Sequence, residues 1–213
     1  MTTDTKYIPA LRFDWLTPIY DPMVRRLMPE VMLKQRLIRQ AQIAAGQRLL
    51  DLGAGTGTLT VMIKQSYPGV EVIGLDGDPV VLATARNKAS TAGVLIRFDQ
   101  GLATALPYDD AAFDRVLTSL VLHHLTTPEK ELALHEAWRV LRPGGELHVL
   151  DFGPPQNALA WLVSLAVRRL ERTGDNILGR LPEMFRQAGF TSVRQTGQHM
   201  TIVGTLALYQ AQR

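Results

Sequence analysis

Residues 49–60, LLDLGAGTGTLT, place three glycines at alternate positions directly after an acidic residue. Glycine-rich turns of this kind often bind phosphate through backbone N–H groups at the start of a helix. Here both known phosphate patterns are incomplete: no Lys followed by Ser or Thr ends the loop, and Thr58 stands where a dinucleotide fingerprint requires glycine. The carboxylate of Asp51 would also repel a diphosphate in a partly dry cleft. The loop therefore favours a bulky ligand with a cationic part.

A second acidic residue, Asp76, closes the next aliphatic run in VIGLDGDP. A carboxylate at this place in a βαβ unit can accept hydrogen bonds from both hydroxyls of a ribose. A nucleoside with a cationic tail and no phosphate corresponds in outline to S-adenosylmethionine. Each acid alone has a plainer explanation, because strand-end Asp residues often cap helices. Their spacing around one glycine loop is what indicates the cofactor.

Two adjacent histidines, His123 and His124, follow a fourth aliphatic run, and Asp151 ends a fifth. Ligands bind outside the carboxyl ends of parallel strands, so we expect these three side chains to face one cleft. A histidine oriented by a carboxylate is a common design for a general base, which would take the proton of a hydroxyl acceptor. Either histidine could be the base while the other packs or caps, and Asp151 could instead orient a loop. The pair lacks the spacing of a metal-ligand set, so no metal is expected.

Short aliphatic runs alternate with amphipathic stretches through most of the chain. They predict strands at 47–53, 70–76, 94–101, 113–119 and 145–153, and helices at 57–66, 79–91 and 128–141. Such an alternation predicts an α/β domain with a doubly wound, mostly parallel sheet that is covered on both faces.

The two ends of the chain depart from this alternation. Residues 22–44 predict one or two amphipathic helices with a break at Pro29, and 156–172 has apolar residues at helical spacing. A short helix and a hairpin around Gly197 are expected to end the fold. We therefore expect a single domain with amino-terminal cap helices (1–45), a cofactor-binding core (46–153), a lid or substrate segment (154–189) and a closing hairpin (190–213).

Four stretches of the chain resemble, in order, the signature stretches of class I S-adenosylmethionine-dependent methyltransferases, especially the ubiquinone and menaquinone C-methyltransferase-like group: LLDLGAGTG, VIGLDGDP, ALPYDDAAFDRVLTSLVLHHL and RVLRPGGELHVLDF. The resemblance covers roughly residues 7–153. It implies a seven-stranded Rossmann-like sheet in the order 3-2-1-4-5-7-6 with an antiparallel last strand, and S-adenosylhomocysteine as the product. It also implies that Asp51 and the glycine loop face the methionine part, that Asp76 binds the ribose, and that Tyr20 closes over the methionine end.

One position departs from the pattern of this group, which usually has an adenine-binding acid four residues before its LP pair. Leu102 stands there, and Asp99 lies three residues earlier. Either Asp99 reaches the adenine through a bulge, or the adenine amine meets a backbone carbonyl while Leu102 packs on the ring. The second alternative is favoured, because sliding a strand by an odd number of residues exchanges its faces. The expected cofactor-binding residues are Tyr20, Asp51, Gly53, Ala54, Gly55, Gly57, Asp76, Gly77, Leu102, Ala103, Ser119 and Leu120.

Composition limits the remaining choices. The 213 residues include no cysteine, which excludes disulfides and thiol nucleophiles. There is no signal-peptide pattern and no apolar run of about 20 residues, so a cytoplasmic protein is expected. The net charge of +3 divides into basic flanks (1–48 and 161–213, each +4) and an acidic centre (49–160, −5). Without interleaved aromatic residues the flanks indicate a solvated surface and no nucleic-acid partner.

The flanks are also the segments expected to choose the methyl acceptor. Met23, Met28, Met32 and Trp161 suit an apolar small molecule such as a quinone precursor or a phospholipid, and the basic rim would suit peripheral contact with a membrane. The plainer account is that both flanks are lid helices. We expect in-line methyl transfer to a small apolar or glycosidic molecule, with O-, N- or C-methylation and the oligomeric state left open. A nicotinamide-dependent oxidoreductase and a module that binds S-adenosylmethionine without turnover are the alternatives.

Overall fold

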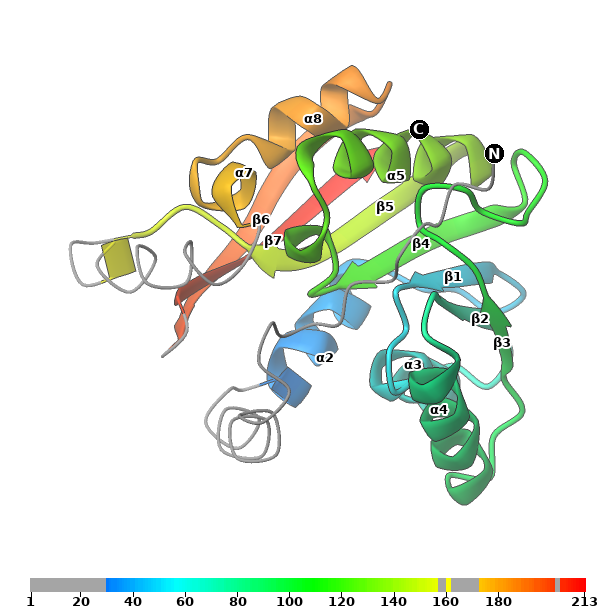
Figure 1. Ribbon diagram of the computed structural model, residues 1–213. Helices are drawn as coiled ribbons and strands as arrows, with labels where there is room; N and C mark the ends of the chain where they lie inside the picture. The colour runs from blue at the N-terminus through cyan, green and yellow to red at the C-terminus, as the bar shows by residue number, and fades with distance from the viewer. Residues whose placement is uncertain (1–29, 157–159, 162–172, 202–203) are drawn as a thin grey trace, which may run out of the picture.

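The computed structural model describes residues 30–156, 160–161, 173–201 and 204–213. Within them, one seven-stranded sheet has the order β3-β2-β1-β4-β5-β7-β6 (Figure 1). The first five strands pair in parallel, whereas β7 runs antiparallel to both β5 and β6. This confirms the predicted α/β class, the strand order and the antiparallel last strand.

The strands are β1 (Arg48–Leu52), β2 (Glu71–Asp76), β3 (Arg97–Gln100), β4 (Phe113–Ser119), β5 (Leu141–Phe152), β6 (Thr191–Thr201) and β7 (Gly204–Gln212). The helices are α2 (Glu30–Gln40), α3 (Thr58–Ser66), α4 (Pro79–Thr91), α5 (Thr127–Val140), α7 (Gly174–Ile177) and α8 (Leu181–Gln187), with a 3-10 turn η1 at Leu122–His124. The predicted core elements are confirmed, but β3 is shorter than 94–101. At the edge of the sheet it pairs with β2 only over these four residues.

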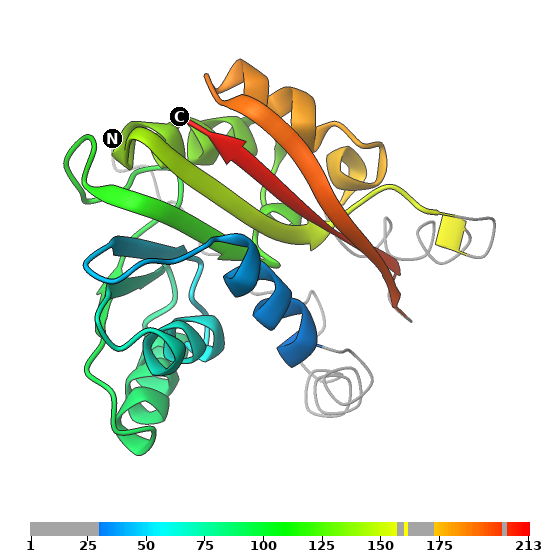
Figure 2. The same ribbon diagram turned by 180° about the vertical axis from the view of Figure 1, so that it is seen from behind.

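Different helices cover the two faces of the sheet (Figures 1 and 2). Helices α5 and α8 pack on one face, where Leu50 and Leu52 of β1 point, and α2 and α3 pack on the other, where Leu49 points. Side chains alternate along a strand. Asp51 is therefore directed to the α2 and α3 face.

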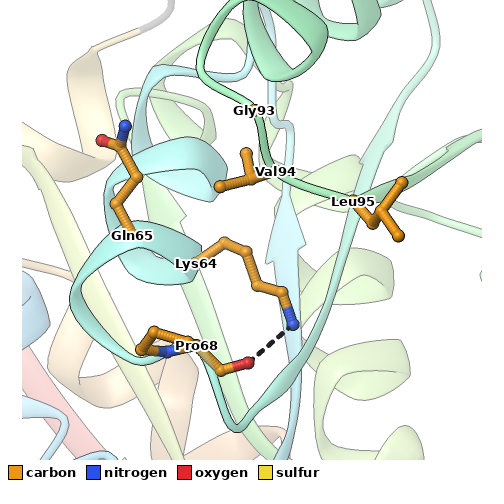
Figure 3. Close-up of a pocket in the computed structure, with 6 residues that line it drawn as sticks. All are labelled: Lys64, Gln65, Pro68, Gly93, Val94 and Leu95. Carbon is orange, nitrogen blue, oxygen red and sulfur yellow. Dashed lines mark hydrogen bonds between the residues drawn. The ribbon is translucent and has the colours of Figure 1, made fainter.

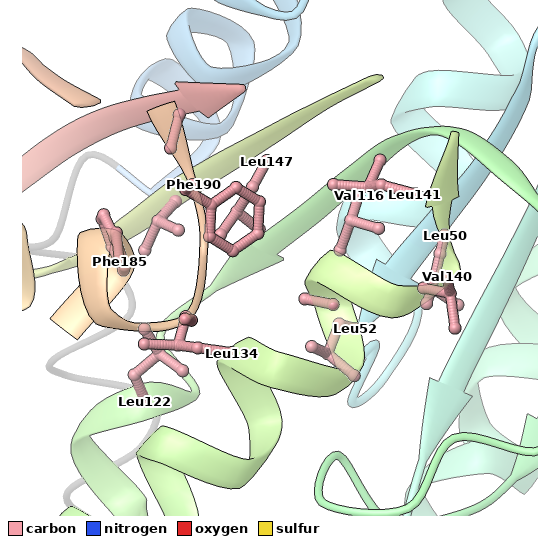
Figure 4. Close-up of a cluster of buried hydrophobic side chains, with 14 of the residues drawn as sticks. Leu50, Leu52, Val116, Leu122, Leu134, Val140, Leu141, Leu147, Phe185 and Phe190 are labelled. Atoms are coloured by element: carbon pink, nitrogen blue, oxygen red, sulfur yellow. The ribbon is translucent and has the colours of Figure 1, made fainter. Parts of the chain in front are cut away.

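The core under α5 and α8 also holds the turn that carries the histidines. Leu122 of η1 is 1% exposed and lies beside Leu134 of α5 (Figure 4). Burying such a leucine contributes about 1.5–3 kcal/mol. Helix α5 begins with a capping box, in which Thr126 and Glu129 satisfy each other's backbone N–H groups. The packing and the cap together fix the segment that contains His123 and His124.

The prediction for the closing hairpin was wrong at its turn. β6 continues through Gly197 to Thr201, and β7 begins at Gly204. Gly197 instead lies at a register shift of the β6–β7 ladder. Glycine inside a strand often marks such a bulge, which explains why the residue is found there. Of the predicted helix at 22–44 the structure describes α2; Pro29, like most of 156–172, lies outside the described residues. No helix in the described ranges is long and apolar enough to cross a membrane.

Candidate functional site

The glycine loop between β1 and α3 has a backbone that other residues would strain. Gly53, Gly55 and Gly57 have φ angles of +75°, +52° and +73°. A Cβ on Gly53 would lie 2.3 Å from Cγ2 of Val121, and one on Gly57 would lie 2.8 Å from Cβ of Ala85. A Cβ on Gly55 would meet nothing within 4 Å. Two glycines thus allow close packing, and Gly55 leaves open space over the loop for a ligand.

Asp76 is held by the same loop. The N–H of Gly55 donates to Oδ2 of Asp76 at 2.8 Å, and the N–H of Asp78 donates to Oδ1 at 3.0 Å. A carboxylate offers about four acceptor positions, so each oxygen keeps capacity for a hydroxyl donor. The half-buried carboxylate is therefore oriented and suited to two neighbouring hydroxyls, as in a ribose.

Asp51 lies on the other side of the loop and is fully buried. Thr60 Oγ1 donates to its Oδ2 at 2.5 Å. Burial raises the pKa of Asp51 to about 6, and the hydrogen bond from Thr60 opposes this effect. At neutral pH the site therefore holds a poorly solvated anion, which favours a cationic group beside it. Sequence reasoning missed Thr60, although its place in GTGTLT at the start of α3 is a usable signal.

The region expected to hold adenine has no bulge in β3. Asp99 accepts a hydrogen bond from the hydroxyl of Tyr108 at 3.0 Å and pairs with Arg97 at 2.9 Å. Leu102 is 49% exposed, and its Cδ2 lies 3.5 Å from the Cβ position of Gly77. These contacts support the alternative in which Leu102 packs on the ring, while its role in binding stays a prediction.

The turn after β4 brings one of the two histidines to Asp151. Nδ1 of His123 lies 2.9 Å from Oδ1 of Asp151, with side chains 6% and 0% exposed. His124 is exposed and packs against His123, with 3.9 Å between the ring centroids and 44° between the ring planes. The structure therefore distinguishes two neighbours that look alike in the sequence: His123 is held by the carboxylate and His124 packs on it.

Asp151 is also hydrogen-bonded by groups other than the histidine. Backbone N–H groups of Val121, Leu122 and Phe152 donate to it at 3.1, 2.8 and 2.7 Å. Asn176 Nδ2 donates to Oδ1 at 3.1 Å. Burial alone would raise the pKa of Asp151, but the attraction and hydrogen bond of His123, together with the N–H of Phe152, outweigh it and hold the pKa below its ordinary value.

Leu120 has a strained backbone between β4 and η1. Its φ of 61° is rare for a branched residue, and its N–H donates to the carbonyl of Leu150 at 2.8 Å. Such strain is common where a turn must place functional groups. Ser119 Oγ is buried and has no partner within the described part of the chain.

The remaining predicted residues have different surroundings. Ala54 is buried against the α4 cluster, and Ala103 packs on the core beneath α5. Tyr20 lies outside the described residues. Their roles in binding stay predictions.

His148 is fully buried in β5. Its Nδ1 is 3.1 Å from Nε2 of Gln40, and burial lowers its pKa, which is typical of a structural histidine.

A hollow lies at the opposite end of the strands, where β2 and β3 begin. It is lined by Lys64, Gln65, Pro68, Gly93, Val94 and Leu95 (Figure 3). The Lys64 ammonium donates to the carbonyls of Pro68 and Val70 at 3.0 and 2.6 Å. This hollow offers a ligand no catalytic group. In the described ranges no three His, Asp or Glu side chains are grouped as metal ligands.

Comparison with known proteins shows the family to which the chain belongs. The model of the family described as a methyltransferase domain matches residues 49–145. The demethylmenaquinone methyltransferase of Thermus thermophilus is 41% identical over 153 residues, covering 71% of this chain and 69% of its own. The chain belongs to the class I S-adenosylmethionine-dependent methyltransferases. Within them it is a member of the ubiquinone and menaquinone C-methyltransferase group.

Two further comparisons are consistent with this assignment. The ubiquinone/menaquinone biosynthesis C-methyltransferase UbiE of Marinomonas is 33% identical over 153 residues, covering 70% of this chain and 58% of that protein. The crystal structure of the YcgJ protein from Bacillus subtilis superposes on the methyltransferase with a TM-score of 0.70 at 20% identity, covering 84% and 97% of the two chains, which shows a shared fold. The cofactor is S-adenosylmethionine, and the open glycine loop with the oriented Asp76 fits its nucleoside.

Proposed function

We propose that this methyltransferase methylates a reduced quinone or a similar apolar aromatic alcohol, with His123 as the general base. The observation that carries the proposal is the 2.9 Å contact between His123 and Asp151 at the carboxyl ends of β4 and β5. The substrate class is supported by the related demethylmenaquinone methyltransferase of Thermus thermophilus.

The hydrogen bonds around Asp151 assign the tautomer of His123. Three backbone N–H groups donate to Asp151, so the carboxylate is held as an anion that can only accept, and Nδ1 of His123 must donate to it. Nε2 of the neutral ring then has a free lone pair. His123 can therefore take a proton, and the anion of Asp151 stabilises the imidazolium that forms.

Proton removal by His123 suits methylation of a ring carbon. Loss of the proton from a ring hydroxyl raises electron density on the adjacent carbon, and a base in this position is worth about 10²–10⁴-fold in rate. Once that carbon has taken the methyl group, it loses its own proton to water and the ring oxygen regains one from the His123 imidazolium, so the aromatic ring and the neutral base are both restored. When bound, S-adenosylmethionine supplies an electrophilic methyl group on its sulfonium. We infer that Asp51 and the glycine loop hold its methionine part, Asp76 its ribose and Leu102 its adenine, with Tyr20 closing over the methionine end.

The acceptor would be enclosed by segments at both ends of the core. In this proposal 1–45 and 154–189 cover the carboxyl ends of β4 and β5, next to His123. Two apolar side chains of these segments lie in the described residues: Met32 of α2 packs on the core of the α2 and α3 face, and Trp161 is 53% exposed. Apolar side chains of this kind suit a lipophilic acceptor.

Histidine variants test the proposal with a short-chain demethylmenaquinol as acceptor. His123→Gln should lower kcat about 10²–10⁴-fold and leave the affinity for S-adenosylhomocysteine within twofold, because the base acts in the transition state. His135→Gln, at an exposed position of α5, is the matched control. Full activity of His123→Gln would exclude His123 as the base. A larger loss in His124→Gln than in His123→Gln would transfer the role to the exposed neighbour.

A further inference from the structure

Helix α7 carries two consecutive buried polar residues, one of which contacts α5 and the other β5. Asp175 accepts from Thr127 Oγ1 at 2.7 Å and pairs with Lys130 Nζ at 3.1 Å, both in α5. Asn176 donates to Asp151 of β5 at 3.1 Å. A single helical turn thus connects α5 to the carboxylate that holds His123.

The amide of Asn176 has only one orientation that fits. It is 0% exposed, and because the Asp151 carboxylate only accepts, the amide nitrogen must face it. Its Oδ1 is buried and has no partner within the described ranges. A buried acceptor in this state costs about 1–3 kcal/mol, which an apolar residue would avoid. The bond to Asp151 is the interaction that offsets this cost.

Asn176 is also a contact of Asp151 that a substitution can remove. Three of the other donors are backbone N–H groups, so in the described part of the chain Asn176 and His123 are the side chains that donate to this carboxylate. Both donate to the same oxygen, Oδ1. The amide therefore orients this oxygen and takes part of the negative charge that faces the imidazole.

The ion pair behind Asn176 keeps the helix in place. Lys130 is 0% exposed and Asp175 is 7% exposed, and separating such a pair leaves a buried charge uncompensated. Arg180 lies 3.4 Å from the other oxygen of Asp175. Movement of Asn176 away from Asp151 therefore requires movement of α7 against α5.

We propose that Asn176 is a positioning residue that fixes the orientation of the Asp151 carboxylate and, through it, of the His123 ring. The proposal rests on the proposed function, in which His123 is the general base. Without the amide, Oδ1 of Asp151 would lose one of the two side-chain donors that it has in the described part of the chain, and the carboxylate and the ring could turn away from their present alignment. Loss of Asn176 should thus slow the chemical step and leave cofactor binding unchanged.

The test measures kcat and KM with a short-chain demethylmenaquinol, together with the NMR spectrum of the His123 ring, which is assigned by comparison with His123→Gln. Asn176→Ala should lower kcat about tenfold and change KM less than twofold, because a misaligned base affects the transition state and not binding. The resonances of the His123 ring should change in the same variant. Asn176→Ser, which keeps a shorter donor, should retain more of the wild-type kcat and replaces the alanine variant if that variant does not fold.

Thr173→Val is the matched control, because Thr173 is also 0% exposed, precedes α7, and has a hydroxyl without a partner in the described ranges. It should leave kcat and the His123 resonances unchanged. The proposal is overturned if Asn176→Ala loses stability while kcat and the His123 resonances stay at their wild-type values. Failure of the proposed function gives another result: His123→Gln would then keep its activity, while the ring resonances still show whether Asn176 positions His123.

Discussion

Gly53 lies against Val121 so closely that a Cβ at position 53 would be 2.3 Å from Cγ2 of the valine. The contact joins the glycine loop after β1 to the turn that carries His123. The two halves of the site, cofactor loop and base, are therefore packed on each other directly.

Gly53→Ala should disturb both halves at once. The new methyl group adds left-handed strain of about 1–2 kcal/mol and displaces Val121, so affinity for S-adenosylhomocysteine should fall at least tenfold in calorimetry. Gly46→Ala is the control, because Gly46 has a similar φ of +80° with nothing within 4 Å of its Cβ position. Gly46→Ala should lower the free energy of unfolding and leave the affinity for S-adenosylhomocysteine unchanged. Gly53→Ala combined with Val121→Ala should recover part of the affinity; no recovery would show that strain and not the clash is responsible.

The pKa of Asp51 predicts a pH-dependent stability of the cofactor-free protein. Burial raises this pKa to about 6 from an ordinary value of 3.8, so the folded chain binds the proton more tightly than the unfolded chain. The free energy of unfolding should therefore fall as the pH rises from about 4 through 6, by about 3 kcal/mol for this group. In urea titrations from pH 4.5 to 7.5, Asp51→Asn should gain stability relative to wild type toward neutral pH. A difference that is constant over this range would contradict the assignment.

The buried pair of Lys130 and Asp175 predicts an asymmetric mutational effect. Lys130→Met leaves the carboxylate of Asp175 buried beside α5 and should cost about 3–5 kcal/mol in urea unfolding. Adding Asp175→Leu should restore most of that loss. Arg186→Ala removes the exposed contact with Glu183 in α8 and should change stability by about 1 kcal/mol or less. A double variant as unstable as Lys130→Met would mean that the ion pair, and not the lone charge, carries the effect.

Leu102 predicts a change in base selectivity. Leu102→Asp places an acceptor where the family usually has one, so the preference for S-adenosylhomocysteine over S-inosylhomocysteine, which lacks the amine, should rise about tenfold in competition calorimetry. Leu132→Asp, at an exposed position of α5, is the control and should leave the preference unchanged. Equal loss of affinity for both ligands would place the amine away from residue 102.

Local patterns were sufficient for the core of the fold. Alternating aliphatic and amphipathic stretches predicted the strands and helices between residues 47 and 153. This works because a strand buried on both faces needs consecutive apolar residues, whereas a helix buried on one face needs them at helical spacing. Gly197 shows where a local pattern is insufficient. A turn and a bulge both favour glycine, and only the pairing of β6 with β7 shows which one is present.

The kinds of functional group in the site were predictable from the sequence, but which histidine contacts the carboxylate was not. The sequence by itself determined the glycine loop, the two acids at the ends of β1 and β2, and a histidine pair near Asp151, since each is a short motif at a strand end. Which histidine meets the carboxylate was decided by tertiary structure. Ser119 pairs with Leu150, and Leu122 is anchored in the core, so the next residue, His123, is directed to Asp151.

Asn176 had no signal in the sequence at all. It lies in a four-residue helix, too short for a periodic pattern, and its partner is 25 residues earlier in the chain. The contact exists because the buried pair of Lys130 and Asp175 fixes α7 against α5 at the carboxyl end of β5. A hydrogen bond between distant residues depends on where packing places both of them, which no local pattern of residue types contains.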